Sequence, residues 1–344
     1  MGPLLTLKVH EALRTAARSR ISAVECSLDL DRSRTSVEVS EHQWRWQGAS
    51  YPFLPACKGR TIYYWAGQDF APVARYTNSL IKLVPTEWGA PTFEIDGIKM
   101  LPTAKVSPYE DARRKVGLIR PRGKAILDTC GGLGYFAAWC LQGQAGHVLS
   151  FEKNADVVWL RGLNPWSPVA IAVELESSSP GATSDGGQSL AAGPPDGPLS
   201  LAAGQSAVGG RSLPVGVQRP ADPGGPPASA AAAPLLAGGL TLVRGDVAMA
   251  ISSLPDRSFD AVLHDPPRFG IAGELYSQAF YDHLARVLRP RGQLFHYTGT
   301  PNKLTTGRDV PKEVASRLRQ AGFSTEMELD GVLAVRRSPL VVSR

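Results

Sequence analysis

The sequence lacks long hydrophobic runs. No window approaches the ~18 consecutive apolar residues that cross a bilayer, and charged residues interrupt the first 20 positions. This pattern fits neither a membrane span nor a secretory signal. Residues 4–17 are Arg-rich and poor in acids, with apolar positions at loose helical spacing, so an organelle transit peptide is the alternative to a surface helix. We predict a surface helix and a cytoplasmic protein.

Cysteine is also scarce. The four cysteines are unequally spaced and contain no C-x-x-C pair: Cys26, Cys57, Cys130 and Cys140. A disulfide scaffold or a zinc site needs a denser and more regular set, so the sequence predicts reduced thiols and no bound metal.

Aromatic residues and lysine are absent from residues 177–239, which hold 13 of the chain's 35 glycines and 10 of its 28 prolines. A segment of this composition buries too little apolar surface to offset its loss of conformational entropy, so we predict a disordered insertion. Its net charge is −1, whereas the whole chain carries +6, so the other 281 residues carry +7. This basic excess is compatible with an anionic partner such as RNA.

At 344 residues and 43% hydrophobic, the chain is long enough for about two domains. Short β-branched and aromatic runs dominate residues 21–101, and Asp96-Gly97 between two apolar triplets is a strong hairpin signal. We predict a small N-terminal α+β domain over residues 1–105. Ser107 and Pro108 then form an N-cap and a first helical turn.

Residues 106–344 alternate between strands and helices on both sides of the insertion. The expected strands cover 125–127, 148–151, 240–243, 259–264, 293–297, 325–329 and 332–335, and the expected helices cover 134–141, 277–288 and 311–320. The alternation predicts an α/β domain with a doubly wound, mainly parallel sheet of seven strands, whose last two strands form an antiparallel hairpin.

Several strand ends carry residues that suit a nucleotide-like ligand. The first strand ends at Asp128 and leads into Cys130-Gly-Gly132-Leu-Gly134, where glycines let the backbone approach a ligand closely. Glu152 ends the second strand and could accept hydrogen bonds from both ribose hydroxyls. Asp246 follows the third strand, where it could meet an adenine amine. Ligands of such sheets bind at the carboxyl ends of the strands.

In this order of motifs the sequence resembles the class I S-adenosylmethionine-dependent methyltransferases, which have a Rossmann-like fold and a first motif D-x-G-x-G-x-G. Cys130 stands where the first glycine is usual. The sequence is most similar to a little-characterised archaeal-type group, through motifs at residues 127–135, 152–153, 163–167, 264–269, 273–276 and 295–299. The resemblance implies S-adenosylmethionine bound by Asp128, Cys130, Gly132, Gly134, Glu152, Asp246 and Asp265. It leaves the methyl acceptor open.

The fourth strand ends in Asp265-Pro266-Pro267-Arg268-Phe269. In methyltransferases that act on exocyclic amines, a similar loop accepts amine hydrogens on the carboxylate and on a proline carbonyl, which implies roles for Asp265 and Pro266. Arg268 replaces the usual aromatic residue and could instead clamp a phosphate or carboxylate. His264 and His296 end neighbouring strands and are candidates for a general base.

Other functions fit parts of this pattern. A covalent pyrimidine C5 mechanism needs a thiolate, but no cysteine follows the fourth or fifth strand. An aminopropyltransferase of the polyamine synthase type uses a similar sheet, but Arg268 would repel a cationic amine. A binding module that has lost turnover is the third alternative. We predict a methyltransferase, with RNA favoured as acceptor on charge alone.

Overall fold

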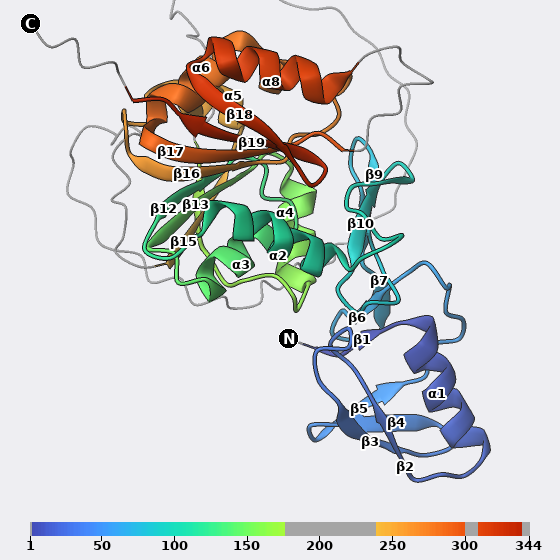
Figure 1. Cartoon of the computed structure of the whole chain (residues 1–344). Coiled ribbons are helices and arrows are strands. Elements are labelled where there is room, and N and C mark those ends of the chain that lie inside the picture. The colour runs from blue at the N-terminus through green and yellow to red at the C-terminus, as the bar shows by residue number, and fades with distance from the viewer. Residues whose placement is uncertain (1, 176–238, 300–308, 339–344) are drawn as a thin grey trace, which may run out of the picture. The chain divides into compact units, whose positions relative to one another are not determined.

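The computed structural model describes residues 2–175, 239–299 and 309–338 (Figure 1). All of the described residues belong to one compact unit. The predicted disordered insertion lies outside the described residues, except for its last residue, Gly239, which begins a strand. Within the described ranges no helix is both long and apolar enough to span a bilayer.

The first hundred residues form one helix and three small antiparallel sheets, with strand orders β1-β6-β7, β2-β3-β4-β5 and β8-β9-β10-β11. Their bounds are β1 Leu4–Leu5, α1 Leu7–Arg18, β2 Ala23–Cys26, β3 Thr35–Val39, β4 Gln43–Trp46, β5 Ala49–Pro52, β6 Tyr63–Trp65, β7 Phe70–Pro72, β8 Ala74–Tyr76, β9 Leu80–Val84, β10 Thr92–Ile95 and β11 Ile98–Lys99.

The first helix begins later than the apolar spacing predicts. Thr6 caps α1, because its hydroxyl accepts a hydrogen bond from the N–H of Val9 at 3.5 Å. Leu4 and Leu5 precede the cap and pair with β6. Both are buried, so the apolar run at the start of the chain reflects a short strand in the core rather than one face of a helix.

Local signals further along the chain are confirmed. Asp96 and Gly97 both have positive φ, 48° and 80°, and join β10 to β11 in the predicted hairpin. Ser107 caps α2 (Pro108–Ile119), and its hydroxyl accepts a hydrogen bond from the N–H of Tyr109 at 3.2 Å.

The rest of the chain builds an eight-stranded sheet in the order β14-β15-β13-β12-β16-β17-β19-β18. The first six strands of this order are parallel to one another: β14, β15, β13, β12, β16 and β17. Strand β19 is antiparallel to both of its neighbours, β17 and β18. Their bounds are β12 Ala125–Asp128, β13 His147–Glu152, β14 Ile171–Glu174, β15 Gly239–Arg244, β16 Phe259–His264, β17 Leu288–Tyr297, β18 Phe323–Glu328 and β19 Gly331–Arg336. The predicted doubly wound α/β fold is confirmed, including the antiparallel hairpin at its end.

The sheet has eight strands rather than the predicted seven because β14 pairs with β15 at the edge. The four residues of β14 are mostly exposed. A short strand that buries little apolar surface has no hydrophobic alternation, so periodicity missed it.

Helices cover both faces of the sheet (Figure 1). One core holds Ile126 of β12 with residues of α2, α3 (Tyr135–Gln142) and α4 (Ala155–Leu163). The other holds Leu127 with residues of α5 (Val247–Ala250), α6 (Gln278–Val287) and α8 (Val310–Gln320). Successive residues of β12 thus enter opposite cores, and the loops at the carboxyl ends of the parallel strands remain available for a site.

Candidate active site

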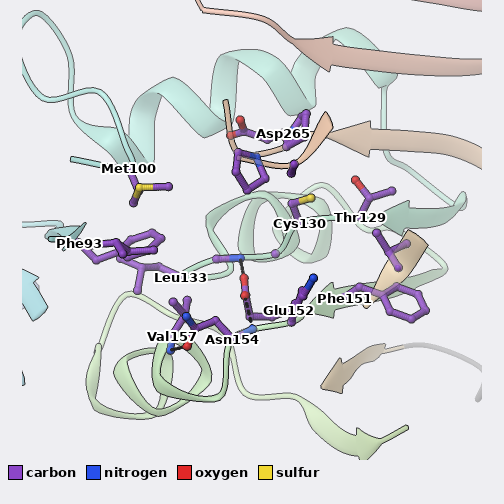
Figure 2. A pocket seen from close by; sticks show the side chains of 18 of the residues that line it. Phe93, Met100, Thr129, Cys130, Leu133, Phe151, Glu152, Asn154, Val157 and Asp265 are labelled. Atoms are coloured by element: carbon purple, nitrogen blue, oxygen red, sulfur yellow. Dashed lines mark hydrogen bonds between the residues drawn. The ribbon is translucent and has the colours of Figure 1, made fainter. Parts of the chain in front are cut away.

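A cavity of about 630 Å³ opens at the carboxyl ends of β12, β13, β15 and β16 (Figure 2). Its wall includes the glycine loop after β12, the ends of β13 and β15, the loop after β16 and part of the β8–β11 sheet. Among the predicted site residues, those that line the cavity are Cys130, Gly132, Glu152, Asp246, Asp265 and Pro266. Those that do not are Asp128, Gly134, His264, Arg268 and His296.

The glycine loop is shaped by its neighbours as well as by its own backbone. Gly132 and Gly134 have positive φ, 49° and 80°. A Cβ on Gly131 would lie 2.3 Å from Ser150 Oγ, and one on Gly134 would lie 2.5 Å from Arg161 Cζ. These positions therefore require glycine. Cys130 is not among the residues with positive φ, so its position accepts a side chain without backbone strain.

Glu152 lies at the end of β13 with its carboxylate against this loop (Figure 2). Oε2 accepts a hydrogen bond from the N–H of Gly132 at 2.9 Å, and Oε1 accepts one from the N–H of Asn154 at 2.8 Å. Burial raises the pKa of Glu152, and these hydrogen bonds oppose the rise. Each carboxylate oxygen keeps a second lone pair with which it can accept a ligand hydroxyl.

Asp128 lies beneath the loop. Its side chain is fully buried, and Ser150 Oγ donates a hydrogen bond to Oδ2 at 2.8 Å. Burial raises its pKa to about 6, and the charge of Arg161 opposes the rise. In this structure Asp128 supports the glycine loop from behind and does not form part of the cavity wall.

Sequence reasoning missed Arg161. The residue is 4% exposed, and among the described residues none forms a hydrogen bond with any of its three guanidinium nitrogens. Its favourable charge interactions are with Asp128 and Glu152. The available signal was a single arginine in the otherwise largely apolar α4.

Asp246 has two local roles at the end of β15. Its carboxylate accepts a hydrogen bond from the N–H of Ala248 at 2.9 Å, which caps α5, and it forms an ion pair with Lys153 at 2.7 Å. The residue lines the cavity on the same side as Glu152, as expected for neighbouring parallel strands.

The loop after β16 brings Asp265, Pro266 and Pro267 into the cavity wall. Within the described ranges the Asp265 carboxylate has neither a hydrogen-bond nor an ion-pair partner. Burial raises its pKa to about 7, and Lys115 nearby opposes the rise. Tyr276 holds the loop by donating a hydrogen bond to the Pro267 carbonyl at 3.1 Å. Arg268 is exposed.

The two histidines form a buried layer outside the cavity wall. His264 Nε2 donates to the Leu275 carbonyl at 3.1 Å, and Nδ1 lies 2.7 Å from the hydroxyl of Thr129. His296 Nδ1 donates to the Tyr297 carbonyl at 2.9 Å, and Nε2 lies 3.0 Å from the hydroxyl of Tyr281. Burial lowers the pKa of His296 to about 4 and also lowers that of His264. Both rings are thus neutral with each nitrogen engaged, which favours a structural role.

Residues 77–101 supply a wall that sequence reasoning did not anticipate. Phe93, Ile95, Met100 and Leu101 line the cavity, and Figure 2 shows Phe93 and Met100. Thr77 Oγ1 donates a hydrogen bond to Asp156 at the start of α4 at 2.7 Å, and Tyr135 of α3 donates one to the Pro91 carbonyl at 2.8 Å. These contacts join residues 44 or more positions apart, so no local pattern signals them.

Comparison with known proteins found no matching family model. The chain is 32% identical over 279 residues to the uncharacterized protein MJ1233 of Methanocaldococcus jannaschii, covering 80% of this chain and 73% of that protein. Among solved structures, spermidine synthase from Thermotoga maritima is 12% identical, with a TM-score of 0.45 and coverage of 84% of this chain and 75% of that one. M. jannaschii TYW2 in complex with AdoMet is 11% identical, with a TM-score of 0.35 and coverage of 76% and 87%. At 32% identity over most of both chains, the protein belongs to the family of MJ1233.

Proposed function

We propose that the protein is an S-adenosylmethionine-dependent methyltransferase. The observation that carries the proposal is the Glu152 carboxylate, hydrogen-bonded to Gly132 at the edge of a cavity whose wall also contains Asp265 and Pro266. A bound S-adenosylmethionine supplies an electrophilic methyl group on a sulfonium centre.

The cavity residues fit that ligand. A Cβ on Gly132 would lie 3.7 Å from the Phe93 ring, so glycine keeps this part of the cavity open. Glu152 would hold the ribose hydroxyls through its remaining lone pairs, and Asp246 would accept from the adenine amine. Asp265 and the Pro266 carbonyl would receive the hydrogens of the methyl acceptor. Methyl transfer needs mainly such positioning, which supplies much of the rate.

Aminopropyl transfer is the second candidate. Arg268 was the sequence argument against a cationic amine, but it is exposed and does not line the cavity. Carboxylates dominate the charged groups that do line it. The net charge of +7 outside residues 177–239 was the sequence argument for RNA as the acceptor, but this positive charge is not found in the cavity wall, where carboxylates outnumber cations.

Calorimetry with two ligands tests these functions. A methyltransferase should bind S-adenosylmethionine more tightly than its decarboxylated form, whereas an aminopropyltransferase should show the reverse preference. If the wild-type protein binds neither ligand, the proposal is wrong. Transfer of tritium from methyl-labelled S-adenosylmethionine into cell extract then tests turnover, because a module without activity would bind the ligand and label nothing.

A further inference from the structure

The charged groups of the cavity are strongly unbalanced. Among the described residues, six carboxylates and one ammonium group line it: Asp111, Glu152, Asp156, Asp246, Asp265, Glu274 and Lys153. An imbalance of this size in a partly closed space sets the sign of the ligand charge that it attracts.

Three of these carboxylates form hydrogen bonds or ion pairs with other groups of the protein. Glu152 accepts from two backbone N–H groups. Asp156 accepts from Thr77 Oγ1 and lies 3.7 Å from the guanidinium of Arg75. Asp246 pairs with Lys153, the one cation that lines the cavity within the part of the chain that the structure describes. These three carboxylates therefore already have hydrogen-bond or ion-pair partners within the protein.

The part near the β16 loop is not neutralised. Asp265 has no hydrogen-bond or ion-pair partner among the described residues, and Asp111 lies in the wall with it. Lys115, 1% exposed, donates to Asp111 at 2.6 Å and lies 3.5 Å from Asp330. Its ammonium also lies 3.8 Å from the centre of the Tyr297 ring. The Lys115 ammonium thus interacts with the three carboxylates of Asp111, Asp330 and Asp265. One cation among three carboxylates leaves an excess of negative charge at this end of the cavity.

The wall across the cavity from Asp265 is apolar. Phe93 and Met100 face the cavity across from Asp265 (Figure 2), and Ile95 and Leu101 extend the same surface. A ligand that suits both walls has a cationic end and a short carbon skeleton. A phosphate group suits neither, because it would meet carboxylates without a counter-charge.

We propose that this end of the cavity binds a small organic amine as its ammonium cation, between Asp265 and Asp111, with the carbon skeleton against Phe93 and Met100. The identification of the amine as the acceptor rests on the proposed function, whereas its binding does not. An ammonium nitrogen has no lone pair until it loses one proton. The Asp265 carboxylate, which lies in the cavity wall without a partner among the described residues, would take that proton. Burial raises the pKa of Asp265 to about 7, which suits a group that accepts and releases a proton near neutral pH.

The test is calorimetric titration of the full chain with phenethylamine and 1,4-diaminobutane, with and without S-adenosylhomocysteine. The matched neutral probes are 2-phenylethanol and 1,4-butanediol, and a 12-nucleotide RNA is the anionic probe. We expect at least one amine to bind at least about tenfold more tightly than its alcohol, a difference of ~1.4 kcal/mol. The RNA should not displace it.

Asp265→Asn should lower the affinity for that amine about tenfold or more. Asp282→Asn is the matched control, because it removes the same charge from an exposed residue of α6 outside the cavity and should leave the affinity unchanged. Circular dichroism confirms that both variants fold.

Equal affinity for amine and alcohol, no binding of either amine, displacement by RNA, or an unchanged affinity in Asp265→Asn would each overturn the inference. These outcomes are separate from the proposed function, which fails when the wild-type protein binds neither S-adenosylmethionine nor its decarboxylated form. Selective amine binding in the absence of S-adenosylhomocysteine would still support the amine site.

Discussion

The Glu152 carboxylate accepts a hydrogen bond from the backbone N–H of Gly132 at 2.9 Å, which joins the ends of two adjacent parallel strands, β12 and β13. The contact holds the glycine loop in its positive-φ conformation and places a charged acceptor at the cavity edge. The shape of the loop and the position of a hydrogen-bond acceptor at the cavity edge thus depend on the same side chain.

Glu152→Gln should weaken S-adenosylmethionine binding about ten- to a hundredfold, because a lost hydrogen bond to a charged group costs about 1.5–3 kcal/mol. Calorimetry measures the change. Glu174→Gln at the end of β14 is the control, since Glu174 is exposed and pairs with Arg244. Equal affinities of the wild type and Glu152→Gln would refute the assigned role of Glu152.

Gly134→Ala should destabilise the protein by about 2 kcal/mol or more, because its φ of 80° disfavours a side chain and its Cβ would overlap Arg161. Gly162→Ala in α4 is the matched substitution. A Cβ there meets nothing within 4 Å, and alanine favours a helix by about 0.5–1 kcal/mol. Urea unfolding should therefore show opposite signs for the two variants, and a stabilised Gly134→Ala would contradict the structure.

Arg161→Met should destabilise the protein more at pH 8 than at pH 5. The folded-state pKa of Asp128 is raised to about 6, so the proton on its carboxylate is lost as pH rises through that value. Above it, the buried carboxylates of Asp128 and Glu152 lose their nearby cation in the variant, whereas below it Asp128 is neutral.

Urea unfolding at the two pH values measures the effect of removing Arg161. Arg161→Lys keeps the charge and should show a smaller dependence on pH. A difference between wild type and Arg161→Met that is the same at both pH values would show that the guanidinium acts through packing alone.

Replacement of residues 177–237 by a Gly/Ser linker of about 15 residues should leave S-adenosylmethionine affinity and thermal stability unchanged. The strands on either side, β14 and β15, are adjacent and parallel, with Glu174 opposite Arg244. The chain must therefore return along the sheet, and a parallel connection takes about a dozen residues or more.

A linker of about four residues is too short for this return and should lower the melting temperature by separating β14 from β15. The cost of closing a longer loop rises only slowly with its length. A large loss of affinity with the long linker would show that the replaced segment contributes to the site.

Local chemistry explains most of what could be predicted. The Asp96-Gly97 hairpin and the Ser107 cap depend on neighbouring residues only, and both are confirmed. Leu4 and Leu5 were predicted to be helical, and β14 was not predicted at all, because pairing with other strands, and not local periodicity, determines the structure of these residues. The carboxyl ends of the parallel strands bring some of the predicted site residues to the cavity wall, Glu152, Asp246 and Asp265 among them, whereas Asp128, His264 and His296 also end strands but do not line it.

The amino-acid sequence by itself determined the alternation of strands and helices, the glycine loop and the acidic strand ends, because these depend on backbone preferences and side-chain periodicity within short windows. Only the tertiary structure decided that Phe93, Met100 and Asp111 complete the cavity. It also decided that the ring nitrogens of His264 and His296 have hydrogen-bond partners within the protein, and that Arg268 is exposed. Packing between segments far apart in the chain makes these assignments, and it leaves no periodic trace in either segment.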